Sequence, residues 1–264
     1  MIIDVHTHPT RQEGDRILSP EEAGRVLLRE MDLDGVTVSA LLGFNVTPGK
    51  SIEQLREIND YSVAIVCAYP DRLFALAFVN PRLPRAEVER ELDRCLSNPA
   101  FKGIKLELDM NCRDRQIDYV AEKAREYNVP VLQHSWYVNC WLMGENQRRN
   151  QQHRSEPHDV ACLARRFPDV RFIMAHLEGC GVRGILDVAD CPNVWIDTSG
   201  SQPFSGTIEY GIETLGAERI LFGSDIPFRC YESQYGRIIG SRMSDADRTR
   251  ILYRNAAALF NIPL

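Results

Sequence analysis

The chain begins with the run IIDVHTH (residues 2–8), which is typical of a buried β-strand and ends in two histidines. Seven further short apolar runs rich in β-branched and aromatic residues follow it. They cover residues 36–43, 73–80, 102–108, 129–135, 170–177, 194–199 and 219–225. The sequence therefore predicts eight strands.

The segments between these runs have the periodicity of amphipathic helices. Val88, Leu92 and Cys95, for example, form one apolar stripe. Two helices are expected to begin after Ser19 and Ser51, each a capping residue followed by an acidic first turn. Alternating strands and helices imply parallel strands buried on both faces, and eight such units close a barrel of about 250 residues.

The predicted fold class is therefore α/β, a (β/α)8 barrel of the TIM type, in a single domain over residues 1–264. A doubly wound open sheet would show the same alternation and remains the rival architecture. The count of eight strands and the lack of GxGxxG after the first strand argue against it. A long irregular connection, residues 136–155, follows the fifth strand, where a barrel places an active-site loop. Its aromatic residues suit either a lid or a loop that packs on itself.

Composition excludes several classes of partner. The formal net charge of −6 offers no basic field for a polyanion, so we expect neither nucleic acid nor an anionic membrane as partner. No run reaches the roughly 18 apolar residues of a membrane span, and the first residues resemble a strand and not a leader, so the cytoplasm is the expected location. The eight cysteines include no CxxC pair and are expected to be reduced and mostly buried. A homo-oligomer is left open.

Side chains that bind metals fall at the predicted strand ends, where an α/β barrel has its active site. The i, i+2 spacing of His6 and His8 places both imidazoles on one face of the first strand. His134, His176 and Asp225 end the fifth, sixth and eighth strands. Imidazole and carboxylate ligands suit Zn²⁺, Mn²⁺, Fe²⁺ or Co²⁺. The sequence therefore predicts a divalent metal at the barrel mouth.

Charged side chains near this site indicate the kind of substrate. Period-two alternation places Gly103, Lys105 and Glu107 on the inner face of the fourth strand, where the two charges serve as substrate ligands or as a structural ion pair. Arg11 and Arg229 follow the first and last strands and could hold a carboxylate in two-point contact. We therefore expect a small, carboxylate-bearing substrate.

The order of motifs along the whole chain resembles the amidohydrolase superfamily, in particular its amidohydrolase-related branch of metal-dependent hydrolases and decarboxylases. The motifs are IDVHTH at 3–8, FKGIKL at 101–106, VPVLQH at 129–134, FIMAHLEG at 172–179, ILFGSDIPF at 220–228 and RILYRNAAALFNI at 250–262.

The resemblance implies a ligand set and a metal. One divalent ion, usually zinc, would be held by His6, His8, His134 and Asp225, with His176 beside it acting on substrate or water. In the binuclear branches a carboxylated lysine bridges two ions, and Lys105 is the matching position here. One ion is the expectation, because the same GxK motif occurs in members that resemble mononuclear enzymes.

The expected activity is that of a metal-dependent hydrolase, in which a metal-activated water attacks a C–O or C–N bond and Asp225 and His176 are catalytic. A non-oxidative decarboxylase of a small acid, aromatic acids included, is the first alternative. The chain is shorter than the decarboxylases it resembles, and this difference in length favours hydrolysis. A barrel that binds metal without turnover is a second alternative, against which the full ligand set argues. A phosphoesterase of the polymerase and histidinol-phosphatase type would need further ligands.

Overall fold

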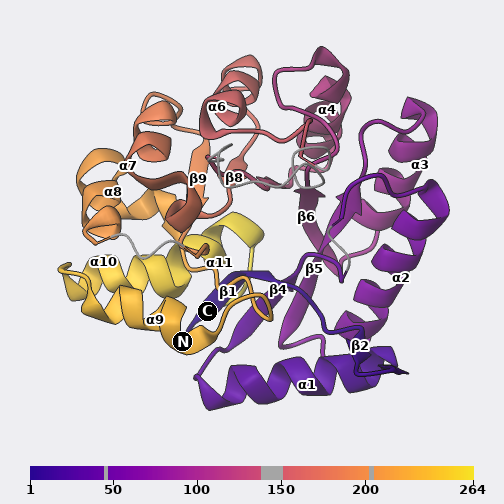
Figure 1. Cartoon of the computed structure of the whole chain (residues 1–264), viewed down its shortest axis with the longest axis horizontal. Helices are drawn as coiled ribbons and strands as arrows, with labels where there is room; N and C mark the ends of the chain where they lie inside the picture. Colours follow the sequence, from indigo (N-terminus) through magenta and orange to yellow (C-terminus); the bar gives the residue numbers. More distant parts are fainter. Residues whose placement is uncertain (45–46, 138–150, 202–204) are drawn as a thin grey trace.

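The computed structural model describes residues 1–44, 47–137, 151–201 and 205–264. Eight parallel strands stand side by side in chain order around a barrel (Figure 1). They are β1 (Ile3–Thr7), β4 (Val38–Leu41), β5 (Leu73–Val79), β6 (Phe101–Leu106), β7 (Val131–Gln133), β8 (Phe172–Met174), β9 (Val194–Asp197) and β10 (Ile220–Leu221). Each overlaps one of the eight predicted runs, so the predicted strands are confirmed.

Backbone hydrogen bonds join the first strand to the last. The amide of Val5 donates to the carbonyl of Phe222 at 3.0 Å, and the amide of Asp225 donates to the carbonyl of His6 at 2.8 Å. These bonds close the ring of strands, which confirms the TIM-type barrel and excludes the open doubly wound sheet.

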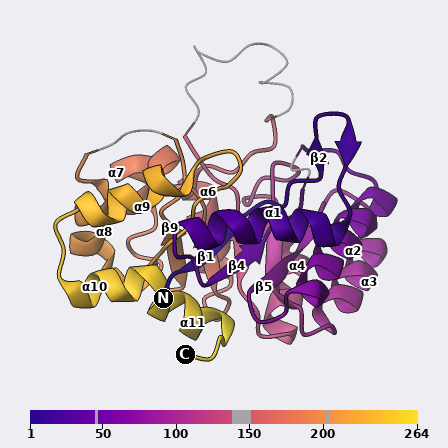
Figure 2. The ribbon, with the colours of Figure 1, turned by 90° about the horizontal axis from the view of Figure 1, so that it is seen from below.

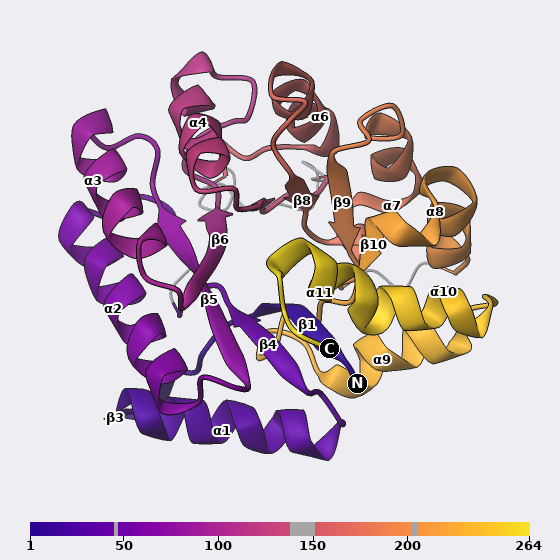
Figure 3. The same ribbon diagram turned by 180° about the vertical axis from the view of Figure 1, so that it is seen from behind.

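Helices surround the barrel on its outside (Figures 1 and 3). In the described residues they are α1 (Pro20–Leu33), α2 (Ile52–Ala68), α3 (Arg85–Leu96), α4 (Asp118–Glu126), α6 (Pro157–Arg166), α7 (Leu177–Asp187), α8 (Thr207–Leu215), α9 (Tyr231–Gly240), α10 (Asp245–Thr249) and α11 (Asn255–Phe260). Ser19 and Ser51 cap α1 and α2, each in a capping box, as predicted.

Alternation along the strands separates two apolar cores. The core inside the barrel is formed by Ile3, Val5, Ala40, Leu42, Phe74, Leu76, Leu132, Ile173, Ala175 and Leu221. Ile104 and Leu106 pack in the other core, between strands and helices, so Lys105 faces inward as predicted. The lower end of the barrel is covered by α11, and the rings of Phe74 and Phe260 lie 4.9 Å apart (Figure 2). The candidate functional site lies at the opposite end of the barrel, at the C-terminal ends of the strands.

Some features differ from the prediction or lie outside it. A short hairpin, β2 (Gln12–Glu13) and β3 (Arg16–Ile17), follows the first strand and was not predicted. Residues 138–150, most of the predicted lid, lie outside the described residues, so the lid stays a prediction. The seven described cysteines are free, and four of them are buried. Within the described ranges, no helix has both the length and the apolar character to cross a bilayer.

Candidate metal centre

His6 and His8 at the end of β1, His134 after β7 and Asp225 after β10 are called the His–Asp cluster below, and the ligand atoms of His6, His8 and Asp225 lie within 4.8 Å of one another. The rings of His6 and His8 lie 5.4 Å apart, and neither residue is more than 4% exposed. Asp225 follows β10 in the left-handed backbone region, with φ of 63°. Such strained conformations gather at functional sites, because the surrounding structure must hold them in place.

Distances within the His–Asp cluster fit a shared cation. Oδ1 of Asp225 lies 3.6 Å from Nε2 of His6 and 3.5 Å from Nε2 of His8, too far for good hydrogen bonds. Two ligands that are each about 2.1 Å from one tetrahedral ion lie roughly 3.4 Å apart. The Nε2 atoms of His6 and His134 are buried and have no hydrogen-bond partner. Since buried polar atoms are normally paired, the cluster has the donor set and the unused valences that a divalent cation would fill.

Burial gives the three histidines the neutral state of metal ligands, and it acts in the opposite direction on Asp225. It lowers the pKa of His8 to about 4, and it lowers the pKa values of His6 and His134 well below the usual range, with the charge of Lys105 as the second cause. Burial raises the pKa of Asp225 to about 7, while Arg229 opposes that shift. Neutral imidazoles have a free lone pair for a metal.

The outer nitrogens of two histidines are fixed by acceptors. Nδ1 of His8 lies 2.8 Å from the carbonyl oxygen of Gly43, and Nδ1 of His6 lies 2.8 Å from Oδ2 of Asp197. A carbonyl or carboxylate oxygen only accepts, so each Nδ1 carries the proton. The Nε2 lone pairs of both rings therefore face Asp225.

His176 lies beside the His–Asp cluster. Its Nε2 is 3.1 Å from Nδ1 of His134, and its Nδ1 is 2.8 Å from Oγ of Ser199. Both ring nitrogens are thus engaged. His6, His176 and Asp197 also group closely enough to suggest an ion site, but Nδ1 of His6 already donates to Asp197, and the ring nitrogens of His176 are engaged by His134 and Ser199.

An ion pair inside the barrel adjoins the cluster. Nζ of Lys105 lies 2.7 Å from Oε1 of Glu107, and the two side chains are 0% and 2% exposed. Oε2 of Glu107 lies 3.3 Å from Nδ1 of His134. The structure therefore places this pair inward as predicted, and its role in binding substrate stays a prediction.

The two predicted arginines lie in different environments. Nη1 of Arg229 donates to the carbonyl of Phe228, and its positive charge acts on Asp225. Arg11 instead pairs with Glu57 at 2.6 Å and stacks on the rings of Phe44 and Tyr61. The guanidinium of Arg11 is thus held at the start of the β2–β3 hairpin, and its contacts give no support to the predicted role in substrate binding.

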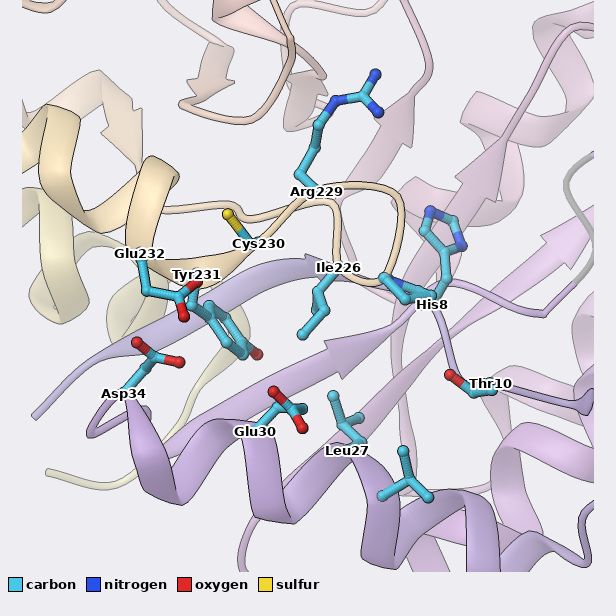
Figure 4. A pocket seen from close by; sticks show the side chains of 12 residues that line it. His8, Thr10, Leu27, Glu30, Asp34, Ile226, Arg229, Cys230, Tyr231 and Glu232 are labelled. Atoms are coloured by element: carbon cyan, nitrogen blue, oxygen red, sulfur yellow. The ribbon is translucent and has the colours of Figure 1, made fainter. Parts of the chain in front are cut away.

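A cavity of about 300 Å³ opens beside His8, between α1 and residues 226–232 (Figure 4). His8 lies at one end of it and Asp34 and Glu232 lie at the other, while the guanidinium of Arg229 points away from α1. The side next to the cluster is therefore the one suited to an anionic group.

Comparisons with known proteins agree with this geometry. The family model described as Amidohydrolase matches residues 3–262. The chain belongs to the amidohydrolase family. Gamma-resorcylate decarboxylase of Polaromonas sp. is 24% identical to this amidohydrolase over 92% of the chain and 90% of its own length.

Solved structures share the fold of this amidohydrolase. A 2,6-dihydroxybenzoate decarboxylase in complex with 2,6-dihydroxybenzoate superposes with a TM-score of 0.76 at 21% identity, over 99% of this chain and 98% of the other. A dihydroxybenzoic acid decarboxylase from Polaromonas sp. with bound manganese and 2-nitroresorcinol gives 0.76 at 20% identity, over 99% and 97%.

Three residues of this amidohydrolase site were not identified from the sequence. Asp197 and Ser199 end the predicted run 194–199 and contact His6 and His176. The ring of Trp136 lies 4.5 Å from that of His134 in an edge-on arrangement and forms an aromatic wall. Asp197 could have been identified from its position at a strand end, because His134 and Asp225 were identified by that criterion.

Proposed function

We propose that this amidohydrolase is a non-oxidative decarboxylase of small hydroxylated aromatic acids and depends on one divalent cation bound by the His–Asp cluster. The observation that carries the proposal is the close approach of His6, His8 and Asp225, whose ligand atoms lie near enough together to hold one ion, with the buried Nε2 of His6 unpartnered. The decarboxylase relatives favour loss of CO2 over hydrolysis.

A cation in this position would bind the oxygens of the acid and withdraw electron density from the bond that breaks. Imidazole with carboxylate suits zinc and manganese alike. Zinc is the expectation from the resemblance, and the manganese in the Polaromonas structure makes that metal an equal candidate.

The chain's own residues bind and orient the acid. Arg229 is the cation at the cavity beside His8, and a guanidinium binds a carboxylate through two parallel hydrogen bonds. Trp136 offers an apolar surface next to His134 against which an aromatic ring can pack.

We assign to Asp225 the transfer of a proton to the ring carbon. When CO2 leaves, the electron pair of the broken C–C bond stays on the ring carbon, which must then take up a proton. Asp225 is the acidic side chain that faces His6 and His8 at this site, and we assign the delivery of this proton to it. His176 has both nitrogens engaged, which supports a role through its neighbours.

Chain length does not decide between the two activities. The alignment with the Polaromonas decarboxylase runs over 304 positions, more than the 264 residues of this chain, yet the similarity covers 90% of that relative and 98% of the superposed 2,6-dihydroxybenzoate decarboxylase. The same cluster can serve hydrolysis, which the experiment below must therefore include.

The test uses protein loaded with Mn²⁺ or Zn²⁺ and two substrate sets, hydroxybenzoic acids including 2,6-dihydroxybenzoate, and a set of lactones and esters. We expect CO2 and the matching phenol from at least one acid, and deuterium at the vacated ring carbon in heavy water. Asp225→Asn should be inactive and folded, whereas Asp71→Asn, at an exposed carboxylate, should match wild type. Turnover of lactones or esters with no CO2 from any acid would overturn the proposal.

A further inference from the structure

We infer that Asp197 and Ser199, at the end of β9, are positioning residues that decide which ring nitrogen of His6 and His176 carries a proton. They thereby direct the Nε2 lone pairs of His6 and His134 toward the cation site. The inference rests on the proposed use of the His–Asp cluster as a cation site, and it concerns residues that touch neither the cation nor the substrate.

Asp197 uses both carboxylate oxygens within the site. Oδ2 accepts from Nδ1 of His6 at 2.8 Å, while Oδ1 accepts from the amides of His176 at 3.1 Å and Ser199 at 3.0 Å. The residue is fully buried, and no lysine or arginine in the described ranges forms an ion pair with it. Because a carboxylate has no proton to donate, His6 must carry its proton on Nδ1.

Ser199 determines in the same way which ring nitrogen of His176 carries the proton. Its hydroxyl contacts Oδ1 of Asp197 and lies 2.8 Å from Nδ1 of His176. The single hydroxyl proton goes to the carboxylate, which can only accept. Oγ of Ser199 therefore accepts from His176, whose proton is on Nδ1 and whose lone pair is on Nε2.

The lone pair of His176 in turn orients His134. Nε2 of His176 lies 3.1 Å from Nδ1 of His134, so His134 donates from Nδ1 and keeps Nε2 bare. That Nε2 is buried and has no hydrogen-bond partner. Oε2 of Glu107 is a second acceptor near Nδ1 of His134 and favours the same tautomer. In this chain of hydrogen bonds His134 donates to His176, His176 donates to Ser199, and the last acceptor is Asp197. Each donated proton therefore points away from the cation site.

The opposite set of hydrogen-bond directions would leave His134 without a lone pair for the cation. If Ser199 donated to Nδ1 of His176, the proton of that ring would sit on Nε2, and His134 would have to accept on Nδ1. His134 would then point an N–H at the cation. The carboxylate of Asp197 excludes this arrangement, because it takes the hydroxyl proton of Ser199.

The experiment reads tautomers directly and does not need turnover. Nitrogen-15 NMR of the metal-free protein, which has six histidines, reports the protonated nitrogen of each ring. Mn²⁺ and Zn²⁺ affinities are measured on the same samples. The variants are Asp197→Asn, Ser199→Ala and Ser199→Thr. Thr198→Val is the matched control, because the buried hydroxyl of Thr198 bonds Gly223 and touches no histidine.

We expect Nδ1-protonated rings at His6, His134 and His176 in wild-type protein. Asp197→Asn has a single oxygen and cannot accept at both positions, so metal affinity should fall about 10- to 100-fold. Ser199→Ala should change the tautomer of His176 and lower affinity less, since Glu107 still supports His134. Ser199→Thr and Thr198→Val should match wild type.

Two results would overturn the inference. One is an Nε2-protonated His6 or His176 in the wild-type protein. The other is a Ser199→Ala variant with the tautomers and metal affinity of the Thr198→Val control. If Asp197→Asn does not fold, the Ser199 variants decide alone, because they leave the backbone bonds to Asp197 in place. Lack of CO2 release would count against the proposed function and not against these results.

Discussion

Nζ of Lys105 lies 2.7 Å from Oε1 of Glu107, and the two side chains are enclosed by the barrel directly below the His–Asp cluster. Each charge is neutralised by the other, while the ammonium also helps to keep the neighbouring imidazoles neutral. Removing one member of such a buried pair is costly, because the remaining charge has neither water nor a partner.

Lys105→Met should therefore lower the free energy of unfolding by about 3–5 kcal/mol. Urea unfolding followed by circular dichroism measures this change. The matched variant is Lys105→Met with Glu107→Gln, which removes both charges and should recover much of the loss. A single variant as stable as wild type would show that the pair is not a structural element.

Gly223 lets β10 pass close to the residues that orient His6. A Cβ at this position would lie 3.1 Å from Cγ of Asp197 and 3.1 Å from Cβ of His6. Neither neighbour is at the end of a flexible chain, so Gly223→Ala should displace Asp197 and weaken metal binding by roughly 10-fold. Gly236→Ala, in open space on α9, is the control. Calorimetric titration with Zn²⁺ gives both affinities, and equal values would contradict the prediction.

His176→Asn should lower kcat by roughly 100-fold with the metal retained, the size of effect expected for a group that supports acid–base chemistry. Oε2 of Glu107 still lies 3.3 Å from Nδ1 of His134 in this variant and favours a proton on that nitrogen, which is why the ion should stay bound. Kinetics and metal analysis of the same preparation test it. Loss of the metal would instead make His176 a ligand, and unchanged kcat would make it structural.

Thiol reactivity should follow burial. Burial raises the pKa of Cys112 to about 12, so almost no thiolate forms there below pH 9. Cys67 and Cys230 are exposed and should react first with iodoacetamide. Mass spectrometry of the labelled peptides should find Cys112 modified only after the barrel unfolds. Labelling of Cys112 in folded protein at pH 8 would show that the core opens readily.

The fold was readily predicted because its signal is local. The apolar runs that form β1 and β5 are bounded by polar residues and match the structure closely. Strand ends also selected His6, His134 and Asp225, since parallel strands bring their C-terminal ends together. The hairpin at Gln12–Ile17 was missed because its strands are only two residues long, are exposed and carry no apolar alternation.

The interactions among strand ends could not be predicted. His6 and Asp197 are 191 residues apart, and neither spacing nor composition indicates that they share a hydrogen bond. The contacts of Arg11 could not be predicted either. Its position after HTHPT suggested a role in binding substrate, which stays a prediction, and the structure pairs it with Glu57 and stacks it on two aromatic rings. Chain length could not decide between hydrolysis and decarboxylation, because the shared barrel covers 99% of this chain and 98% of the superposed one.

Metal content per chain tests the central claim most directly. Protein equilibrated with excess Zn²⁺ or Mn²⁺, desalted and analysed by inductively coupled plasma mass spectrometry, should hold close to one ion per chain. His6→Ala and Asp225→Asn should hold almost none while keeping the circular dichroism of a folded barrel, and Lys105→Met should still hold one. Two ions in wild-type protein, or full metal content in Asp225→Asn, would contradict the account.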